Sequence, residues 1–284
     1  MQLDVISRIH SLTENLSASH AAAFIGCAAL ALCFLVTNAK SLPLVYTVRL
    51  LPPVWRLLRP RLFPSRKIQK PLIPKPPSSS SLAQAAAARP VLFKYHSSSS
   101  RTALAELDIN IHKSNSTFFA DADISRAELL TRLLSQGLAT AGPNSAPVVP
   151  LLAAVQCSFK REIGPFQAYD VSSRILAWND RSLFVITYFL KPGFKLPPDV
   201  EVAGGPGAVL RDASLRRAVF AVMLSKYVCK AGRETVAPTV VLEAAGLLVS
   251  EGPANKKDYT ALLAADDVEK ALKSGMQYVC ECML

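Results

Sequence analysis

Apolar residues recur at helical spacing in the middle of the chain and at strand-like spacing on both sides of it. In residues 116–139 they fall three and four positions apart, which predicts a long amphipathic helix that Gly142 and Pro143 end. The flanking segments are rich in β-branched and aromatic residues. They predict five strands, at residues 102–111, 148–163, 169–178, 182–190 and 217–229. This arrangement indicates an α+β domain.

The segments between and after these elements carry turn and helix signals. The serines of residues 97–100 predict a turn before the first strand. The long Pro/Gly-rich stretch 191–207 predicts either a surface excursion or a lid. Residues 238–248 and 257–273 predict two further helices, so we expect the chain to end in a helical extension.

An uncharged, mostly apolar run occupies residues 21–37, near the lower limit of the roughly 17 to 25 residues that span a bilayer as a helix. Lys40 and a series of arginines follow it, which predicts that its C-terminal side faces the cytosol. A cleavable secretory signal is the alternative, because Thr37, Asn38 and Ala39 resemble a cleavage site. Against it, the preceding segment is long and slightly acidic. A buried core helix is the third reading.

The formal net charge of +11 belongs to one part of the chain. Residues 15–105 contain no Asp or Glu and carry twelve Lys or Arg, whereas residues 106–284 carry no net charge. The excess therefore favours an anionic membrane surface as partner over nucleic acid. Residues 42–63, which include Trp55, predict an interfacial segment in which Pro52 and Pro53 interrupt any long helix.

A Pro-, Ser- and Ala-rich composition follows, which cannot bury enough apolar surface to fold alone. We therefore expect a disordered linker that holds the folded domain near the membrane in variable orientation. The predicted parts are a short N-terminal segment (1–20), a transmembrane helix (21–37), a basic interfacial segment with linker (38–90), a folded domain (91–250) and a C-terminal helical extension (251–284).

The candidate chemistry lies just before the long helix. Asp108, Asn110 and His112 stand at alternate positions, which on an extended backbone places their side chains on one face. Ser114, Asn115 and Ser116 follow as helix N-cap residues. Free N–H groups at a helix start stabilise a developing oxyanion, and a nearby carboxylate serves as general base or nucleophile. The alternative is a chance string in which His112 is a hydrogen-bonded turn residue.

This segment resembles the Asp-x-Asn-x-His-x-Asn-Asn motif of plant acyl-carrier-protein thioesterases and the Asp-x-x-x-His-x-Asn-Asn motif of acyl-CoA thioesterases of the 4-hydroxybenzoyl-CoA type. Asn115 matches the second Asn, whereas Ser114 replaces the first and Phe118 stands where an aromatic, often Tyr, is usual. The resemblance covers residues 93–248. It is closest to the membrane-linked thioesterase-like proteins of animals and fungi, some of them associated with secondary metabolism.

The resemblance implies a hotdog fold, in which an antiparallel sheet wraps a central helix, and a homodimer that hydrolyses an acyl-CoA or acyl-carrier thioester. Asp108, Asn110 and His112 would be catalytic. Backbone groups at Asn115, Ser116 and Thr117 would bind the substrate. Plant enzymes have a further Glu downstream, and Glu162 is its nearest candidate by strand position.

Other chemistries find little support. The six cysteines form no disulfide framework, and Cys280 and Cys282 are weak as a zinc site. A phosphate-binding glycine loop, a Gly-x-Ser-x-Gly elbow and a His-Glu-x-x-His pair are missing from the sequence, so we expect no cofactor and no metal. The alternatives to a thioesterase are a non-catalytic acyl-binding or scaffolding protein at a membrane, and a hotdog dehydratase, whose usual His motif differs.

Overall fold

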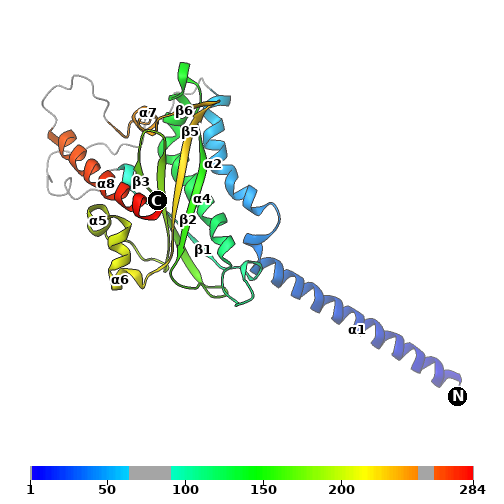
Figure 1. The fold of residues 1–284 in the computed structure, drawn as a ribbon. Coiled ribbons are helices and arrows are strands. Elements are labelled where there is room, and N and C mark those ends of the chain that lie inside the picture. The colour runs from blue at the N-terminus through cyan, green and yellow to red at the C-terminus, as the bar shows by residue number, and fades with distance from the viewer. Residues whose placement is uncertain (1, 64–90, 249–258, 284) are drawn as a thin grey trace, which may run out of the picture.

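The fold is built on a curled antiparallel sheet. The computed structural model describes residues 2–63, 91–248 and 259–283 (Figure 1). The strands run in the order β1-β3-β4-β5-β2, and β6 pairs with β5. Their bounds are β1 His96–Arg101, β2 Val149–Phe159, β3 Ala168–Trp178, β4 Leu183–Leu190, β5 Val219–Ala231 and β6 Glu234–Val236. The sheet curls around one long helix, which confirms the hotdog fold.

Helix α4, Asn115–Thr140, is that central helix, and it confirms the helix predicted from the apolar spacing. Its buried leucines, among them Leu130 and Leu134, pack against Ile175 of β3 and Val185 of β4. At about 1.5 Å per residue its 26 residues span roughly 39 Å, the length of the domain. The start of α4 lies at the lower end of the sheet in Figure 1.

Four of the five predicted strands are present, and the first prediction is wrong. Residues 102–111 contain the short 3-10 helix η3 (Leu104–Glu106) and a loop, whereas the expected turn at residues 97–100 is part of β1. These serines form a strand because their hydroxyls bond across to β3: Ser97 Oγ lies 2.7 Å from Ser172 Oγ. Ser99 Oγ donates to Asp170 at 2.7 Å. Cross-strand polar pairs of this kind stabilise an exposed edge.

A second layer covers the outer face of the sheet. Helix α5 (Pro198–Arg211) occupies part of the expected excursion, and α6 (Ala213–Arg216) follows it. Helix α7 (Pro238–Ala244) instead packs on α4. Helix α8 (Tyr259–Met283) packs on β3 so closely that a Cβ at Gly275 would lie 2.6 Å from the Leu176 carbonyl oxygen. Tyr278 joins the apolar cluster on that face. The C-terminal helix therefore completes the core.

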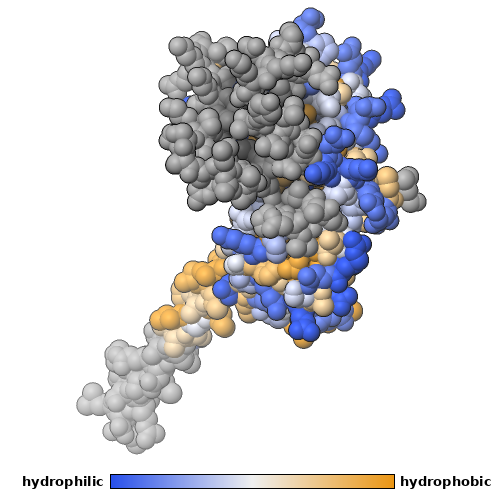
Figure 2. Space-filling model, turned by 90° about the vertical axis from the view of Figure 1, so that its left-hand side faces the viewer, coloured by the Kyte–Doolittle hydropathy of each residue, from blue (hydrophilic) through white to orange (hydrophobic). Residues whose placement is uncertain are grey.

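Two helices precede the domain. In α1 (Gln2–Thr37), residues 20–37 are apolar and unburied, long enough to cross a membrane, although a signal sequence also fits this description. Figure 2 shows this apolar part in orange, projecting from the lower end of the domain. The 3-10 helix η1 (Ala39–Ser41) joins α1 to α2.

Helix α2 (Val45–Leu62) runs unbroken through Pro52 and Pro53, so the predicted interruption is wrong. Tertiary contacts outweigh the helix-breaking tendency. Arg49 lies 3.4 Å from Asp121 and Arg56 lies 2.5 Å from Glu128, both on α4. Both arginines therefore pair with carboxylates of the folded domain. The predicted linker after residue 63 lies outside the described residues.

Candidate active site

Residues 107–113 form a tight loop and not the extended strand that the alternation predicted. Leu107 and Lys113 form an isolated antiparallel bridge. Inside it the Asp108 N–H donates to the His112 carbonyl at 2.9 Å, and the Ile111 N–H donates to the Asp108 carbonyl at 3.0 Å. Ile111 has a φ of 61°, in the left-handed region that is unusual for a β-branched residue.

The Asp108 carboxylate explains why these residues turn. Its Oδ1 accepts the Asn110 N–H at 2.9 Å and the His112 N–H at 3.4 Å. An aspartate that accepts backbone N–H groups two and four residues ahead stabilises a turn in place of a strand. The alternate polar residues that looked like one face of a strand are therefore gathered by a loop.

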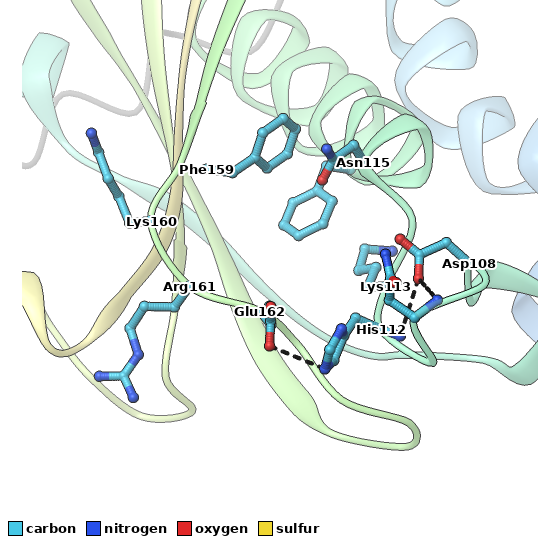
Figure 3. A pocket seen from close by; sticks show the side chains of 10 residues that line it. Asp108, His112, Lys113, Asn115, Phe159, Lys160, Arg161 and Glu162 are labelled. Carbon is cyan, nitrogen blue, oxygen red and sulfur yellow. Dashed lines mark hydrogen bonds and ion pairs between the residues drawn. The ribbon is translucent and has the colours of Figure 1, made fainter.

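The loop borders a cavity of about 640 Å³ in front of the start of α4 (Figure 3). Asp108, Asn110, His112 and Asn115 line it, so four of the six predicted site residues come together. The rest of the wall consists of Lys113, Phe118, Phe159, Lys160, Arg161 and Glu162. Ser116 and Thr117 are not among these lining residues. The wall has two sources: the loop with the start of α4, and the chain that leaves the end of β2.

Glu162 is the residue that the sequence indicated only weakly. Its Oε2 lies 3.0 Å from Nε2 of His112, an ion pair or hydrogen bond according to the charge of the imidazole. Figure 3 shows the two side chains reaching toward each other across the cavity mouth. The glutamate is largely exposed, and it comes from the segment after β2, fifty residues further along the chain. Its place near the end of the strand predicted at residues 148–163 was the available signal.

The start of α4 offers backbone donors to this cavity. Ser114 is the N-cap residue, but within the described chain its side chain makes no capping bond, and its Oγ lies 3.0 Å from Ser116 Oγ. The first N–H groups of a helix have no intrahelical acceptor. The Thr117 N–H is engaged, because it donates to the Ser114 carbonyl at 3.0 Å. The N–H groups at Asn115 and Ser116 are the first two of the helix, and Asn115 lines the cavity.

A buried ionic cluster that was not predicted from the sequence lies directly behind the loop. Lys113 Nζ is fully buried, 3.1 Å from Asp121 Oδ2 and 3.3 Å from Glu106 Oε1. Lys40, which precedes α2, lies 2.8 Å from Glu106 and 3.1 Å from Asp121. Tyr169 donates to Asp121 at 2.5 Å. Two ammonium groups, together with the Arg49 guanidinium 3.4 Å from Asp121, thus pair with two carboxylates.

Burial and charge shift the proton affinities within this cluster. Burial lowers the pKa of Lys113, and Lys40 lowers it further, against the attraction of Asp121 and Glu106. Burial opposes ionisation of Asp121, but Lys113 and Lys40 outweigh it, and the pKa of Asp121 falls below its ordinary value. Burial, together with the charge of Asp121, raises the pKa of Tyr169.

The same cluster fixes the base of the loop. The Glu106 carboxylate accepts the Ala103 N–H at 3.0 Å, and the Glu106 carbonyl accepts the Ser114 N–H at 2.7 Å. The Lys113 N–H donates to the Ile163 carbonyl at 2.8 Å, which joins the loop to the segment that carries Glu162. The cluster therefore sets the position of both walls of the cavity.

The chain is similar in sequence to a known family and to several known proteins. The family model described as the thioesterase-like superfamily matches residues 102–244. Thioesterase poxG of Penicillium oxalicum is 42% identical over 168 residues, which are 55% of this chain and 55% of that protein. Thioesterase lcsJ of Purpureocillium lilacinum is 31% identical over 252 residues, which are 81% of this chain and 75% of that one.

The match thus spans about half the length of the Penicillium relative and three quarters of the Purpureocillium one. Among solved structures, a 1,4-dihydroxy-2-naphthoyl-CoA thioesterase from Synechocystis aligns with a TM-score of 0.37 and 12% identity. That alignment covers 54% of this chain and 95% of the Synechocystis chain.

Proposed function

The chain belongs to the thioesterase-like superfamily, and from that membership we propose that it hydrolyses an acyl-CoA or acyl-carrier thioester in lipid or secondary-metabolite metabolism. One observation carries the proposal: Asp108, His112 and Asn115 line a single cavity at the start of a helix. A carboxylate, an imidazole and free backbone donors are the groups that acyl transfer to water requires.

Asp108 is the general base of the proposed reaction. It removes a proton from a water molecule while the water oxygen attacks the thioester carbonyl carbon. The carbonyl oxygen becomes an oxyanion, which the N–H groups at Asn115 and Ser116 stabilise. The carbon–sulfur bond then breaks, and the thiolate takes the proton from Asp108. If Asp108 instead attacks the carbonyl carbon itself, the carbon–sulfur bond breaks, the thiolate leaves and an acyl anhydride forms. Water then hydrolyses the anhydride in a second step and supplies the proton that the thiolate takes.

His112, Asn110 and Glu162 position the reactants. A hydrogen bond from the His112 Nε2–H to Glu162, whose atoms lie 3.0 Å apart, fixes the tautomer and leaves Nδ1 as an acceptor. Asn110 lines the same cavity and supplies an amide that orients water or the thioester. Glu162 then plays the part of the second acid that the sequence did not locate with certainty.

The cavity mouth suits a phosphorylated carrier. Lys160 and Arg161 line the cavity, and both residues are exposed. Phosphate groups of CoA, or of the phosphopantetheine arm of a carrier protein, pair with such cations. The apolar part of the wall, Phe118 and Phe159, whose ring centroids lie 5.2 Å apart, suits the acyl chain.

We also propose a homodimer. Strand β2 lies at the edge of the sheet, with no partner on its outer side among the described strands, and it exposes apolar residues such as Val149, Leu151 and Leu152. An exposed apolar edge of this kind favours pairing with another copy. Because β2 leads directly into residues 159–162 of the cavity wall, a second copy paired there would also border the site.

Helix α1 is the proposed single-pass membrane anchor, with the domain on the cytosolic side. Retention of α1 is supported by Asn38, which is buried: its Oδ1 accepts the Ala105 N–H at 2.6 Å. Cleavage after Ala39 would remove this buried partner. In the competing interpretation, a protein secreted after signal cleavage, the domain would therefore lose a buried hydrogen bond.

The test is thiol release by the full chain in detergent micelles, from short, medium and long acyl-CoAs and from acyl-carrier substrates. The proposal expects release from at least one series. It expects Glu162→Gln to reduce kcat/KM about tenfold while substrate binding persists. Substrate binding without release from any thioester would instead identify an acyl-binding protein.

A further inference from the structure

The end of the proposed anchor is built into the candidate site. Asn38 directly follows Thr37, the last residue of the apolar part of α1, and is 1% exposed. Its Nδ2 donates to the Phe34 carbonyl at 2.9 Å, and its Oδ1 accepts from the Ala105 N–H at 2.6 Å. Ala105 stands three residues before Asp108. One side chain thus joins the helix to the base of the loop.

Lys40 makes a second connection at the same place. It lies 2.8 Å from Glu106 and donates to Tyr169 at 2.7 Å. These partners are buried in the domain. An ion pair and hydrogen bonds therefore fix the end of α1 to the domain. Figure 1 shows α1 leaving the lower end of the domain, next to the start of α4. The candidate loop therefore lies where the apolar helix emerges.

The tip of that loop carries two solvent-exposed apolar side chains. Ile109 is 97% exposed and Ile111 is 65% exposed, although they alternate with the polar residues of the site. Neither residue lines the cavity. Ile111 in addition holds a left-handed backbone conformation that disfavours a β-branched side chain. Two isoleucines in water at the edge of a site indicate an apolar partner.

We propose that Ile109 and Ile111 insert into the surface of the bilayer that α1 anchors, so that the site opens at the membrane. The occupant of this apolar tip is lipid, because the tip adjoins the end of an apolar helix that requires the same environment. The site then takes thioesters whose acyl chain is dissolved in the bilayer. This inference rests on the proposed membrane anchoring and on the proposed hydrolysis.

Tryptophan fluorescence of the full chain in phosphatidylcholine vesicles tests the insertion. The chain has two tryptophans, of which Trp178 is buried and stacks on Phe93, so it gives a constant background. In a Trp55→Phe background, Ile109→Trp places a reporter at the tip. The matched control is Val240→Trp, because Val240 is a 43% exposed apolar residue on α7, which packs at the far end of α4.

Lipids brominated on the acyl chain should quench the tryptophan at position 109, and aqueous iodide should not. The control at position 240 should show the reverse. Quenching of position 109 by iodide would overturn the proposal. A second result would also overturn it: the tryptophan at position 109 is protected from both quenchers, and this protection disappears when the protein is diluted among more vesicles. That result would identify a second copy of the chain as the partner of the loop tip.

Kinetics test the substrate class separately. Ile109→Ser combined with Ile111→Ser should lower kcat/KM about tenfold for a long-chain acyl-CoA dissolved in the vesicles, which is the scale of losing one buried aliphatic side chain. Hydrolysis of a short, water-soluble acyl-CoA should stay unchanged. Equal losses on both substrates would overturn the inference. Lipid quenching without hydrolysis of any thioester would refute the proposed function and leave the insertion standing.

Discussion

The candidate loop and the ionic cluster behind it are neighbours with opposite characters. The loop carries Asp108 and His112 on an exposed turn that its own backbone bonds maintain. The cluster of Lys40, Lys113, Asp121 and Glu106, with Tyr169, is largely buried, and its carboxylates are paired with cations. Chemistry needs groups that reach a substrate, whereas a buried charge persists only with a partner. We therefore assign reaction to the loop and positioning to the cluster.

The largest predicted effect breaks the cluster. Asp121→Asn leaves Glu106 as the one carboxylate beside Lys40 and Lys113, and it removes the partner of Arg49. It should therefore reduce the free energy of unfolding by about 3 to 5 kcal/mol. Urea unfolding of the full chain in detergent micelles measures this loss. Asp180→Asn, in an exposed turn, is the control and should change stability little. A loss under about 1 kcal/mol for Asp121→Asn would show that the cluster does not carry the fold.

The second prediction addresses the loop. His112→Ala should lower kcat/KM for thioester hydrolysis roughly ten- to a hundredfold, because it removes the group that orients substrate and water. The midpoint of urea unfolding should stay near that of the parent chain, since the imidazole is partly exposed and its partner Glu162 is largely exposed. An equal fall in activity and stability would mean that His112 is a structural turn residue.

Acid should weaken the cluster by protonating Asp121. The pKa of Asp121 is lowered from an ordinary value of 3.8, so its contribution to stability is present above that pH and is lost as pH falls below it. Midpoints of thermal unfolding between pH 6 and pH 3 should decline most steeply at the acid end. The Asp121→Asn chain should decline less over that interval. Parallel declines of the two chains would assign acid sensitivity to other carboxylates.

The smallest effect comes from Glu128 of α4, whose two arginine partners are more exposed than those of Asp121. Glu128 accepts from Arg56 and Arg132, both substantially exposed, so Glu128→Gln should reduce the free energy of unfolding by less than about 1 kcal/mol. Urea unfolding with and without added salt checks this, because salt should weaken the parent chain's pair. A loss as large as that of Asp121→Asn would remove the distinction between buried and exposed pairs.

The sequence predicted what local patterns determine. Helix α4 and the strands after it follow from apolar spacing, because burial on one face imposes that spacing. The prediction of a strand at residues 102–111 was wrong because Asp108, Asn110 and His112, although they alternate, belong to a turn. Helix α2 continues through Pro52 and Pro53 because ion pairs with α4, which is distant in sequence, stabilise it.

The candidate site was predicted in part for the same reason. Asp108, Asn110 and His112 are close in sequence, so a short motif indicated them. Glu162 and the partners of the cluster are distant: Lys40 meets Asp121 from 81 residues away. Contacts across such distances leave no local signature. The roles of the site residues and the boundaries between the five expected parts remain predictions.

The most direct test of the account is Asp108→Asn in the full chain, measured for thiol release and for urea unfolding on the same preparation. Asparagine keeps the oxygen that accepts the Asn110 N–H, so the loop should keep its shape. The account predicts that kcat falls roughly a hundredfold or more, as expected for loss of a general base, while stability is unchanged. Activity within about threefold of the parent chain would contradict it, and would remove Asp108 from the reaction.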